Sequence, residues 1–147
     1  MVPLVAALLA WIRMTAGYEI PETRPEIRFV SNQYIVDTLC DGKECGAVAM
    51  YLREDTIYLD ERLDVLHDFR HRSVLLHELV HWVQTRSGKF PGRDCETWLA
   101  QEREAYALQA RWLGDRRAFF LSKIQFLPRD FCERVRARET AAVPTAN

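Results

Sequence analysis

Two histidines with a glutamate between them stand near the middle of the chain, in the stretch His77-Glu78-Leu79-Val80-His81. On an α-helix, residues four apart lie on the same face, so His77 and His81 can present two imidazole nitrogens to one metal ion. Glu78 follows the first histidine, where its carboxylate can reach a water molecule bound to that metal. Zinc lowers the pKa of bound water toward ~7, which makes proton transfer to a carboxylate feasible. The spacing therefore predicts a zinc site that activates water.

The residues around this motif predict a buried helix. Apolar side chains flank the three polar ones almost all round: Val74, Leu75, Leu76, Leu79, Val80, Trp82 and Val83. A surface helix would show a single apolar stripe, so we expect this segment to lie inside the protein. Buried histidines and a buried glutamate are costly unless they are paired or bound to a metal. The alternative is a core helix whose histidines merely hydrogen-bond to neighbouring groups.

A catalytic zinc site usually has a third protein ligand and an open position for water. A second predicted helix, residues 95–113, carries Glu96, Glu102 and Glu104. Glu102 lies on the apolar stripe of this helix, four residues after Trp98 and four before Tyr106. Glu104 falls on the other side and is expected to face solvent. We therefore predict Glu102 as the ligand, with Glu104 as the alternative if the helical phase is displaced by a residue or two.

The two segments together, His77-Glu-Leu-Val-His81 and Glu102-Arg-Glu-Ala-Tyr106, resemble the gluzincin class of zinc metallopeptidases over about residues 47–113. In that class a glutamate on a second helix completes the ligand set. A small sheet before the zinc helix binds the substrate in extended form along its edge strand. The resemblance implies one Zn²⁺ ion held by His77, His81 and Glu102, with Glu78 as general base and a peptide or protein as substrate.

The chain departs from the gluzincin pattern at Tyr106, where many members carry an aspartate that supports the first histidine. A tyrosine hydroxyl can also accept a hydrogen bond from the ring of His77, so Tyr106 is a candidate supporting residue. The alternative is an ordinary core aromatic. A donor that stabilises the oxyanion is not singled out by the sequence. The candidates are His67, His71, Tyr51 and Tyr58, of which the two histidines are expected in an exposed loop.

The predicted activity is metalloendopeptidase-like hydrolysis of peptide bonds. Glu78 would take a proton from the attacking water and pass it to the leaving amine. The alternative is a zinc-binding module with little or no turnover that acts in protein binding or regulation, because the chain is short for a full gluzincin cleft.

Length and charge restrict the other possibilities. The chain has 147 residues, of which 48 % are hydrophobic, and this predicts a single domain with a substantial core. Its 20 lysines and arginines nearly balance its 21 aspartates and glutamates. Nucleic-acid-binding domains normally show a basic face, so no nucleic-acid partner is expected. Nothing in the sequence indicates an oligomeric state.

Four cysteines permit two disulfides. Cys40 and Cys45 would close a tight turn, and Cys95 with Cys132 would tie the second long helix to the C-terminal segment. The alternatives are free buried thiols or a second zinc site made of cysteines. Disulfides would imply an oxidising compartment, so we expect a periplasmic or secreted protein, or a cytoplasmic one if the cysteines are reduced.

The apolar run over residues 2–12 has the length of the hydrophobic region of a signal peptide, but no basic segment precedes it. It is too short to span a bilayer, so no transmembrane helix is expected. We favour a folded helix over residues 3–16, because Trp11 and Arg13 suit such a helix better than a discarded leader. An export signal would then lie outside this chain or be absent.

The remaining elements follow from local patterns. Alternation predicts a strand over 26–31, before a helical turn at 31–37, and a hairpin of strands 47–53 and 56–60 joined at Glu54-Asp55. The motif helix is predicted over 73–86, with Asp68 or Ser73 as N-cap and Gly88 after its end. Asp94 is the predicted cap of the helix over 95–113.

The C-terminal part is predicted as a closing segment over 114–138, with a short charged helix at 130–138, and a loose tail over 139–147. The whole chain, residues 1–147, is thus expected to form one α+β, zincin-like domain. Its small antiparallel sheet or hairpin would pack on the motif helix and on the second long helix.

Overall fold

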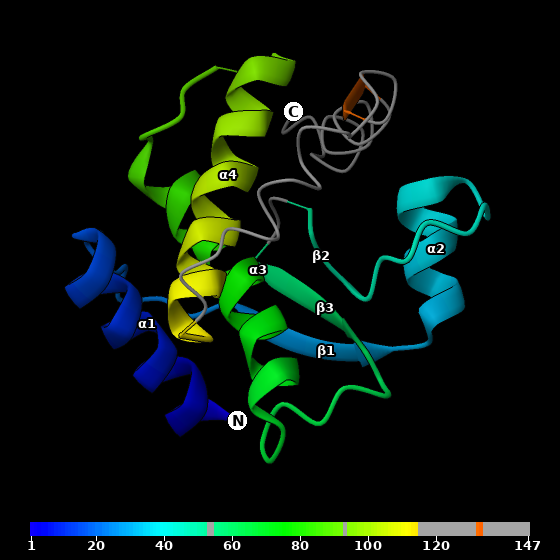
Figure 1. The fold of residues 1–147 in the computed structure, drawn as a ribbon, viewed down its shortest axis with the longest axis horizontal. Coiled ribbons are helices and arrows are strands. Elements are labelled where there is room, and N and C mark those ends of the chain that lie inside the picture. The colour runs from blue at the N-terminus through cyan, green and yellow to red at the C-terminus, as the bar shows by residue number, and fades with distance from the viewer. Residues whose placement is uncertain (53–54, 93, 115–131, 134–147) are drawn as a thin grey trace, which may run out of the picture.

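The computed structural model describes residues 1–52, 55–92, 94–114 and 132–133 (Figure 1). In chain order the elements are α1 (Val2–Ala16), β1 (Glu26–Val30), α2 (Asn32–Cys40), β2 (Ala49–Tyr51), β3 (Thr56–Asp60), α3 (Phe69–Ser87) and α4 (Cys95–Trp112). Four helices and one three-stranded sheet in this part of the chain confirm the α+β class.

The sheet has the order β1-β3-β2, with β3 in the centre. β2 and β3 form the predicted antiparallel hairpin, although β2 is shorter than the predicted strand over 47–53. β1 pairs with β3 in parallel, so the sheet is mixed rather than purely antiparallel. The parallel pairing is possible because the chain passes through α2 and β2 before β3, which gives the long connection that parallel strands need.

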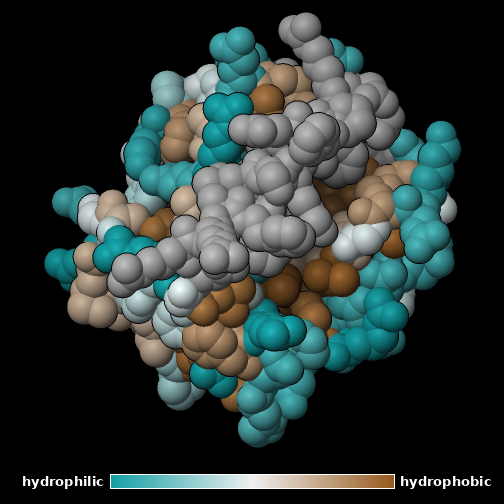
Figure 2. Space-filling view, in the orientation of Figure 1, coloured by the Kyte–Doolittle hydropathy of each residue, from teal (hydrophilic) through white to brown (hydrophobic). Residues whose placement is uncertain are grey.

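The central strand, β3, is buried along its whole length, and side chains on its two faces pack into two different hydrophobic clusters. Ile57 and Leu59 join the main core with residues of α1 and α3, whereas Tyr58 joins Ile35 of α2 and Met50 of β2. Successive side chains of a strand point to opposite faces, which explains this division. Figure 2 shows polar side chains over much of the outer rim, with apolar ones gathered nearer the middle of that face.

The motif helix is longer than predicted. α3 begins at Phe69 rather than Ser73, because Asp68 is the N-cap and its side chain accepts hydrogen bonds from the backbone N–H groups of Arg70 and His71. It ends, as predicted, before Gly88, whose φ of 66° is the left-handed conformation that favours glycine.

The second long helix agrees closely with its prediction. Asp94 caps α4 by accepting a hydrogen bond from the backbone N–H of Thr97. The helix ends at Trp112, one residue before the predicted end. α4 packs along α3, so these two helices are the pair that positions the candidate site.

The N-terminal apolar run is a folded helix, as we predicted. α1 buries Leu8, Leu9 and Ile12 in the main core, where they contact the same cluster as the apolar residues of α3. Trp11 makes an edge-to-face contact with Trp112 at the end of α4. α1 therefore belongs to the same core that supports the motif helix.

Replacing Leu8 by alanine should destabilise the domain by about 2–5 kcal/mol, because Leu8 has no exposed surface and the change leaves a cavity. Urea denaturation followed by circular dichroism measures the free energy of unfolding. Met14 on the same helix is 78 % exposed, so Met14→Ala should change that free energy by less than ~0.5 kcal/mol. Equal, small effects of both substitutions would show that α1 contributes little to the core.

Both predicted disulfides are present, Cys40–Cys45 and Cys95–Cys132. The alternatives of free thiols and of a cysteine zinc site are therefore wrong. The first disulfide closes the turn after α2, and the second links the start of α4 to a residue far along the chain.

Three predictions fall largely outside the described residues: the closing segment 114–138, its helix over 130–138, and the tail 139–147. Of these positions only Gly114, Cys132 and Glu133 are described. In the part of the chain that the structure describes, every helix is too short or too polar to cross a membrane.

Candidate metal centre

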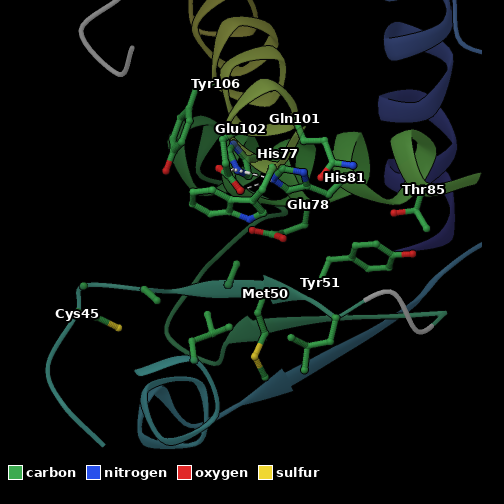
Figure 3. A pocket seen from close by; sticks show the side chains of 16 residues that line it. Cys45, Met50, Tyr51, His77, Glu78, His81, Thr85, Gln101, Glu102 and Tyr106 are labelled. Carbon is green, nitrogen blue, oxygen red and sulfur yellow. Dashed lines mark hydrogen bonds and ion pairs between the residues drawn. The ribbon is translucent and has the colours of Figure 1, made fainter. Parts of the chain in front are cut away.

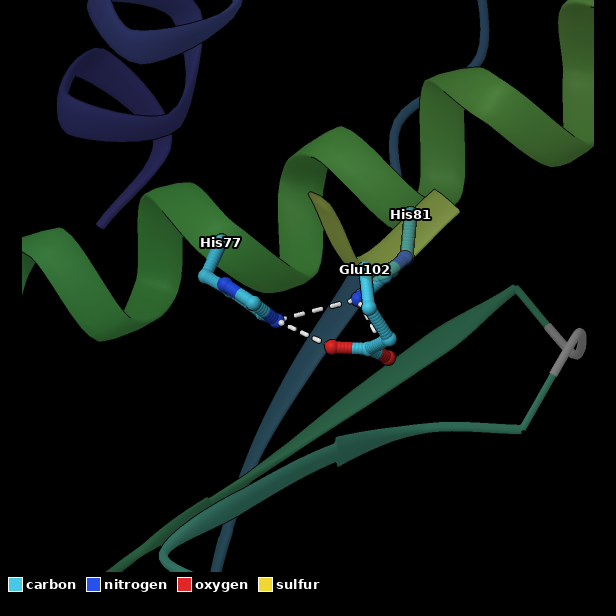
Figure 4. A group of neighbouring side chains, drawn as sticks. All are labelled: His77, His81 and Glu102. Carbon is cyan, nitrogen blue, oxygen red and sulfur yellow. Dashed lines mark hydrogen bonds and ion pairs between the residues drawn. The ribbon is translucent and has the colours of Figure 1, made fainter. Parts of the chain in front are cut away.

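The three predicted ligands meet at one point between α3 and α4 (Figure 4). The Nε2 atoms of His77 and His81 lie 3.0 Å apart. Glu102 reaches both of them from α4, with its Oε2 atom 3.4 Å from Nε2 of His77 and its Oε1 atom 3.2 Å from Nε2 of His81. Residues four apart on one helix and one carboxylate from a neighbouring helix thus form a compact donor set.

These separations fit a single metal ion among the donors. Tetrahedral zinc with ligand bonds of about 2.0–2.1 Å holds its ligand atoms ~3.3 Å apart. The two Nε2 atoms are 3.0 Å apart, and each lies 3.2 or 3.4 Å from one of the two carboxylate oxygens of Glu102, which is close to that spacing. Two imidazole nitrogens that face each other this closely repel unless a proton or a cation lies between them. The chemistry of the donor set, two nitrogens and a carboxylate, also suits zinc.

The charges of the group favour a cation in the same place. Burial alone would raise the pKa of Glu102, but the imidazoles of His81 and His77 hold it well below its ordinary value. Burial alone would lower the pKa of His81, yet the carboxylates, above all that of Glu102, raise it to about 9. The ionised carboxylate of Glu102 therefore attracts positive charge to the point where the two rings meet.

Glu78 lies beside the donor set without joining it (Figure 3). Its side chain is buried and lines the same cleft as His77, His81 and Glu102. Burial raises the pKa of Glu78, and the nearby imidazoles offset this only in part. A carboxylate in this position can exchange a proton with a molecule bound in the cleft.

The cleft has a volume of about 260 Å³ and lies between the helices and the sheet (Figure 3). α3 and α4 supply its polar side, with the three candidate ligands and Glu78. β2 and the residues next to it supply the other side, including Ala49, Met50, Tyr51 and Leu52. The donor set is therefore open to a ligand that lies along β2.

Gln84 supports one of the candidate ligands, and sequence reasoning missed it. Its side-chain oxygen lies 2.9 Å from Nδ1 of His81. An amide oxygen only accepts, so Nδ1 of His81 donates to it, and Nε2 is the nitrogen that faces the donor set. The available signal was a hydrogen-bonding side chain three positions after His81, on the same face of the helix.

Glu104 lies away from the donor set. Its carboxylate accepts hydrogen bonds from the Tyr18 hydroxyl, the Gln84 amide and the Lys89 ammonium group. The prediction that it faces solvent is wrong, because its side chain is only 21 % exposed. Glu102, not Glu104, shares the space between the two histidines.

A model of a known protein family matches the part of the chain that contains the candidate site. The model of a Domain of unknown function (DUF6647) matches residues 1–122. The chain belongs to the DUF6647 family. The match extends from α1 through α4 and includes all three candidate ligands. No curated protein and no solved structure matches the chain.

Tyr106 does not play the predicted part in this DUF6647 domain. Its ring packs against His77 with centroids 4.4 Å apart, and Figure 3 shows its hydroxyl turned away from that imidazole. Nδ1 of His77 is buried and has no hydrogen-bond partner among the described residues. The expectation that the hydroxyl accepts a bond from His77 is therefore wrong, because the packing of α3 on α4 brings the two rings into a tilted contact instead, with 59° between their planes.

Replacing Tyr106 by phenylalanine should leave zinc affinity unchanged, because the ring contact with His77 is retained. Loss of a hydrogen bond that supports a ligand would instead weaken binding by about 10–100-fold. Competition with a chromogenic chelator measures the affinity. Tyr106→Ala, which removes the ring as well, is the comparison that should show an effect. A tenfold or greater loss in Tyr106→Phe would restore the hydroxyl as a supporting group.

Among the four candidate donors for the oxyanion, only Tyr51 lines the cleft of the DUF6647 domain. His67, exposed as expected, interacts with Asp64 before the start of α3. The expectation of an exposed loop is wrong for His71, which lies in the first turn of α3 and accepts a hydrogen bond from the backbone N–H of Asp64. Tyr58 packs with Ile35 of α2 and Met50 of β2 in the second hydrophobic cluster. Two residues that the sequence did not single out, Thr85 and Gln101, also line the cleft.

Proposed function

We propose that this domain binds one zinc ion through His77, His81 and Glu102 and hydrolyses peptide bonds with Glu78 as general base. The observation that carries the proposal is the convergence of the three donors beside a buried glutamate in one cleft. Three protein ligands leave a position open for water or substrate, as catalytic zinc sites require.

When bound, zinc would lower the pKa of water and polarise the carbonyl of the scissile bond. Glu78 accepts a proton from the attacking water and donates it to the leaving amine nitrogen. The second transfer is favourable because an amine nitrogen is a stronger base than a carboxylate.

The cleft favours an extended peptide as substrate. β2 is an edge strand, so one of its sides is not paired within the described sheet, and β2 lines the cleft opposite the donor set. A peptide in extended form can add to such an edge through main-chain hydrogen bonds. The backbone of the bound peptide would then lie next to the donor set and Glu78.

We also propose that the protein works in an oxidising compartment, the periplasm or the cell exterior. Two disulfides in a small domain support this proposal, because thiols are kept reduced in the cytoplasm of most cells.

The test is cleavage of an unstructured peptide mixture by the zinc-loaded protein, with the products identified by mass spectrometry. We expect new termini that appear with time, disappear after chelation and return when zinc is added back. Tight zinc binding without cleavage of any peptide would contradict the proposed activity and favour the non-catalytic zinc module.

A further inference from the structure

Gln84 is held in a single orientation by the groups around its amide. It is only 1 % exposed, and its Nε2 atom donates to the backbone oxygen of Gln101, at 3.1 Å, and to Oε2 of Glu104, at 2.9 Å. A backbone oxygen and an ionised carboxylate only accept hydrogen bonds. The NH₂ group must therefore face these two acceptors, and the side-chain oxygen must face His81.

This orientation fixes the proton on the imidazole of His81. Because the oxygen of Gln84 can only accept, Nδ1 of His81 must donate, at the distance of 2.9 Å. Nε2, which points at the donor set, is then the nitrogen that is free to bind a cation. Nothing comparable supports the other histidine, since Nδ1 of His77 has no partner among the described residues.

Glu104 is held in turn by residues from two other parts of the chain. Tyr18, just after the end of α1, donates its hydroxyl proton to Oε2, and Lys89, just after the end of α3, donates to Oε1. The ammonium group of Lys89 also lies 5.1 Å from the centre of the Tyr18 ring. Three segments that are far apart in the sequence thus meet at one carboxylate.

We infer that Gln84 is a positioning residue for His81, and that Glu104, fixed by Tyr18 and Lys89, keeps Gln84 in its working orientation. The inference rests on the zinc site of the proposed function. It gives a structural role to the buried amide of Gln84, which would be costly inside an apolar core without its hydrogen-bond partners. It also explains why two glutamates two positions apart on α4, Glu102 and Glu104, serve the same site from different directions.

The main test is zinc affinity of Gln84→Leu, measured by competition with a chromogenic chelator and zinc alone. We expect the affinity to fall by about 10–100-fold, the usual effect of losing a group that orients a ligand. Gln109→Leu is the matched control. Gln109 is also a buried glutamine that links α4 to α3, through Ser73, but it does not contact the donor set. Gln109→Leu should lower stability and leave zinc affinity unchanged.

A rescue variant separates the hydrogen bond from packing. The double change Gln84→Glu with Glu104→Gln keeps an acceptor for Nδ1 of His81 and avoids two facing carboxylates. It should recover most of the affinity that Gln84→Leu loses. Equal losses in Gln84→Leu and Gln109→Leu, or no recovery in the double variant, would overturn the inference.

A measurement on the unaltered protein does not depend on how the variants fold. In the zinc-loaded protein, nuclear magnetic resonance should show a slowly exchanging proton on Nδ1 of His81. A resonance assignment with Nδ1 unprotonated would overturn the inference. A wild-type protein that binds zinc but cleaves no peptide would remove the proposed activity and leave the role of Gln84 standing, whereas failure to bind zinc would end both.

Discussion

Replacing His77 by alanine should abolish stoichiometric zinc binding while the domain stays folded. The substitution leaves only His81 and Glu102, which are too few ligands to retain the ion against dialysis. Loss of a supporting group already weakens metal sites by about 10–100-fold, so loss of a direct ligand should weaken this one by more than ~100-fold. Metal content per protein after dialysis, measured by atomic emission, is the direct readout.

His71→Ala is the control for this experiment. His71 lies on the same helix, but its ring accepts a hydrogen bond from the Asp64 backbone and takes no part in the donor set. Its replacement should leave zinc content unchanged. Glu102→Ala should lose zinc as His77→Ala does. Retention of zinc in Glu102→Ala would mean that another group completes the ligand set.

Replacing Glu78 by glutamine should lower the rate of peptide cleavage by about 10²–10⁴-fold, the usual contribution of a general base. The amide has nearly the same shape as the carboxylate but cannot accept the proton of the attacking water. Zinc affinity should stay the same, because Glu78 is not among the three donors. Initial rates on one peptide identified as a substrate, at saturating zinc, measure the effect.

Glu96→Gln provides the matched control, since Glu96 is an exposed carboxylate in the first turn of α4. It should cleave at the rate of the unaltered protein. If Glu78→Gln cleaves as fast as the unaltered protein, Glu78 is not the base, and the mechanism proposed above fails. If Glu78→Gln loses its zinc, the residue acts on the metal site rather than on the proton.

Local patterns predicted most of the fold. The start and end of α4, the end of α3 and the strand β3 agree with the sequence to within a residue, because caps, glycines and alternation act over a few neighbouring positions. The predicted start of α3 was four residues late because Asp68 and Ser73 are both acceptable caps, and in the structure Asp68 is the one that accepts the hydrogen bonds of the first turn. The parallel pairing of β1 was not predicted, since it joins segments that are distant in the sequence.

The surroundings of the candidate site were predicted less well than its donors. The role of Gln84 was missed, and Glu104 was wrongly expected to face solvent. Tyr106 was predicted to accept a hydrogen bond from His77, which the structure does not show. Each of these roles depends on where a side chain points after the helices have packed. A periodic pattern indicates which face of a helix is buried, but it does not indicate which neighbouring atom each buried group meets.

By itself, the sequence determined the relation between His77, Glu78 and His81, because one helix with about 3.6 residues per turn fixes how they lie relative to one another. It also determined that Glu102 is on the buried face of α4. Only the tertiary structure decided that this carboxylate meets the two imidazoles, and that Glu104 reaches Gln84 instead. The reason is physical: the packing of α3 on α4 and of α1 beside them sets the distances between helices, and no pattern within one helix contains that information.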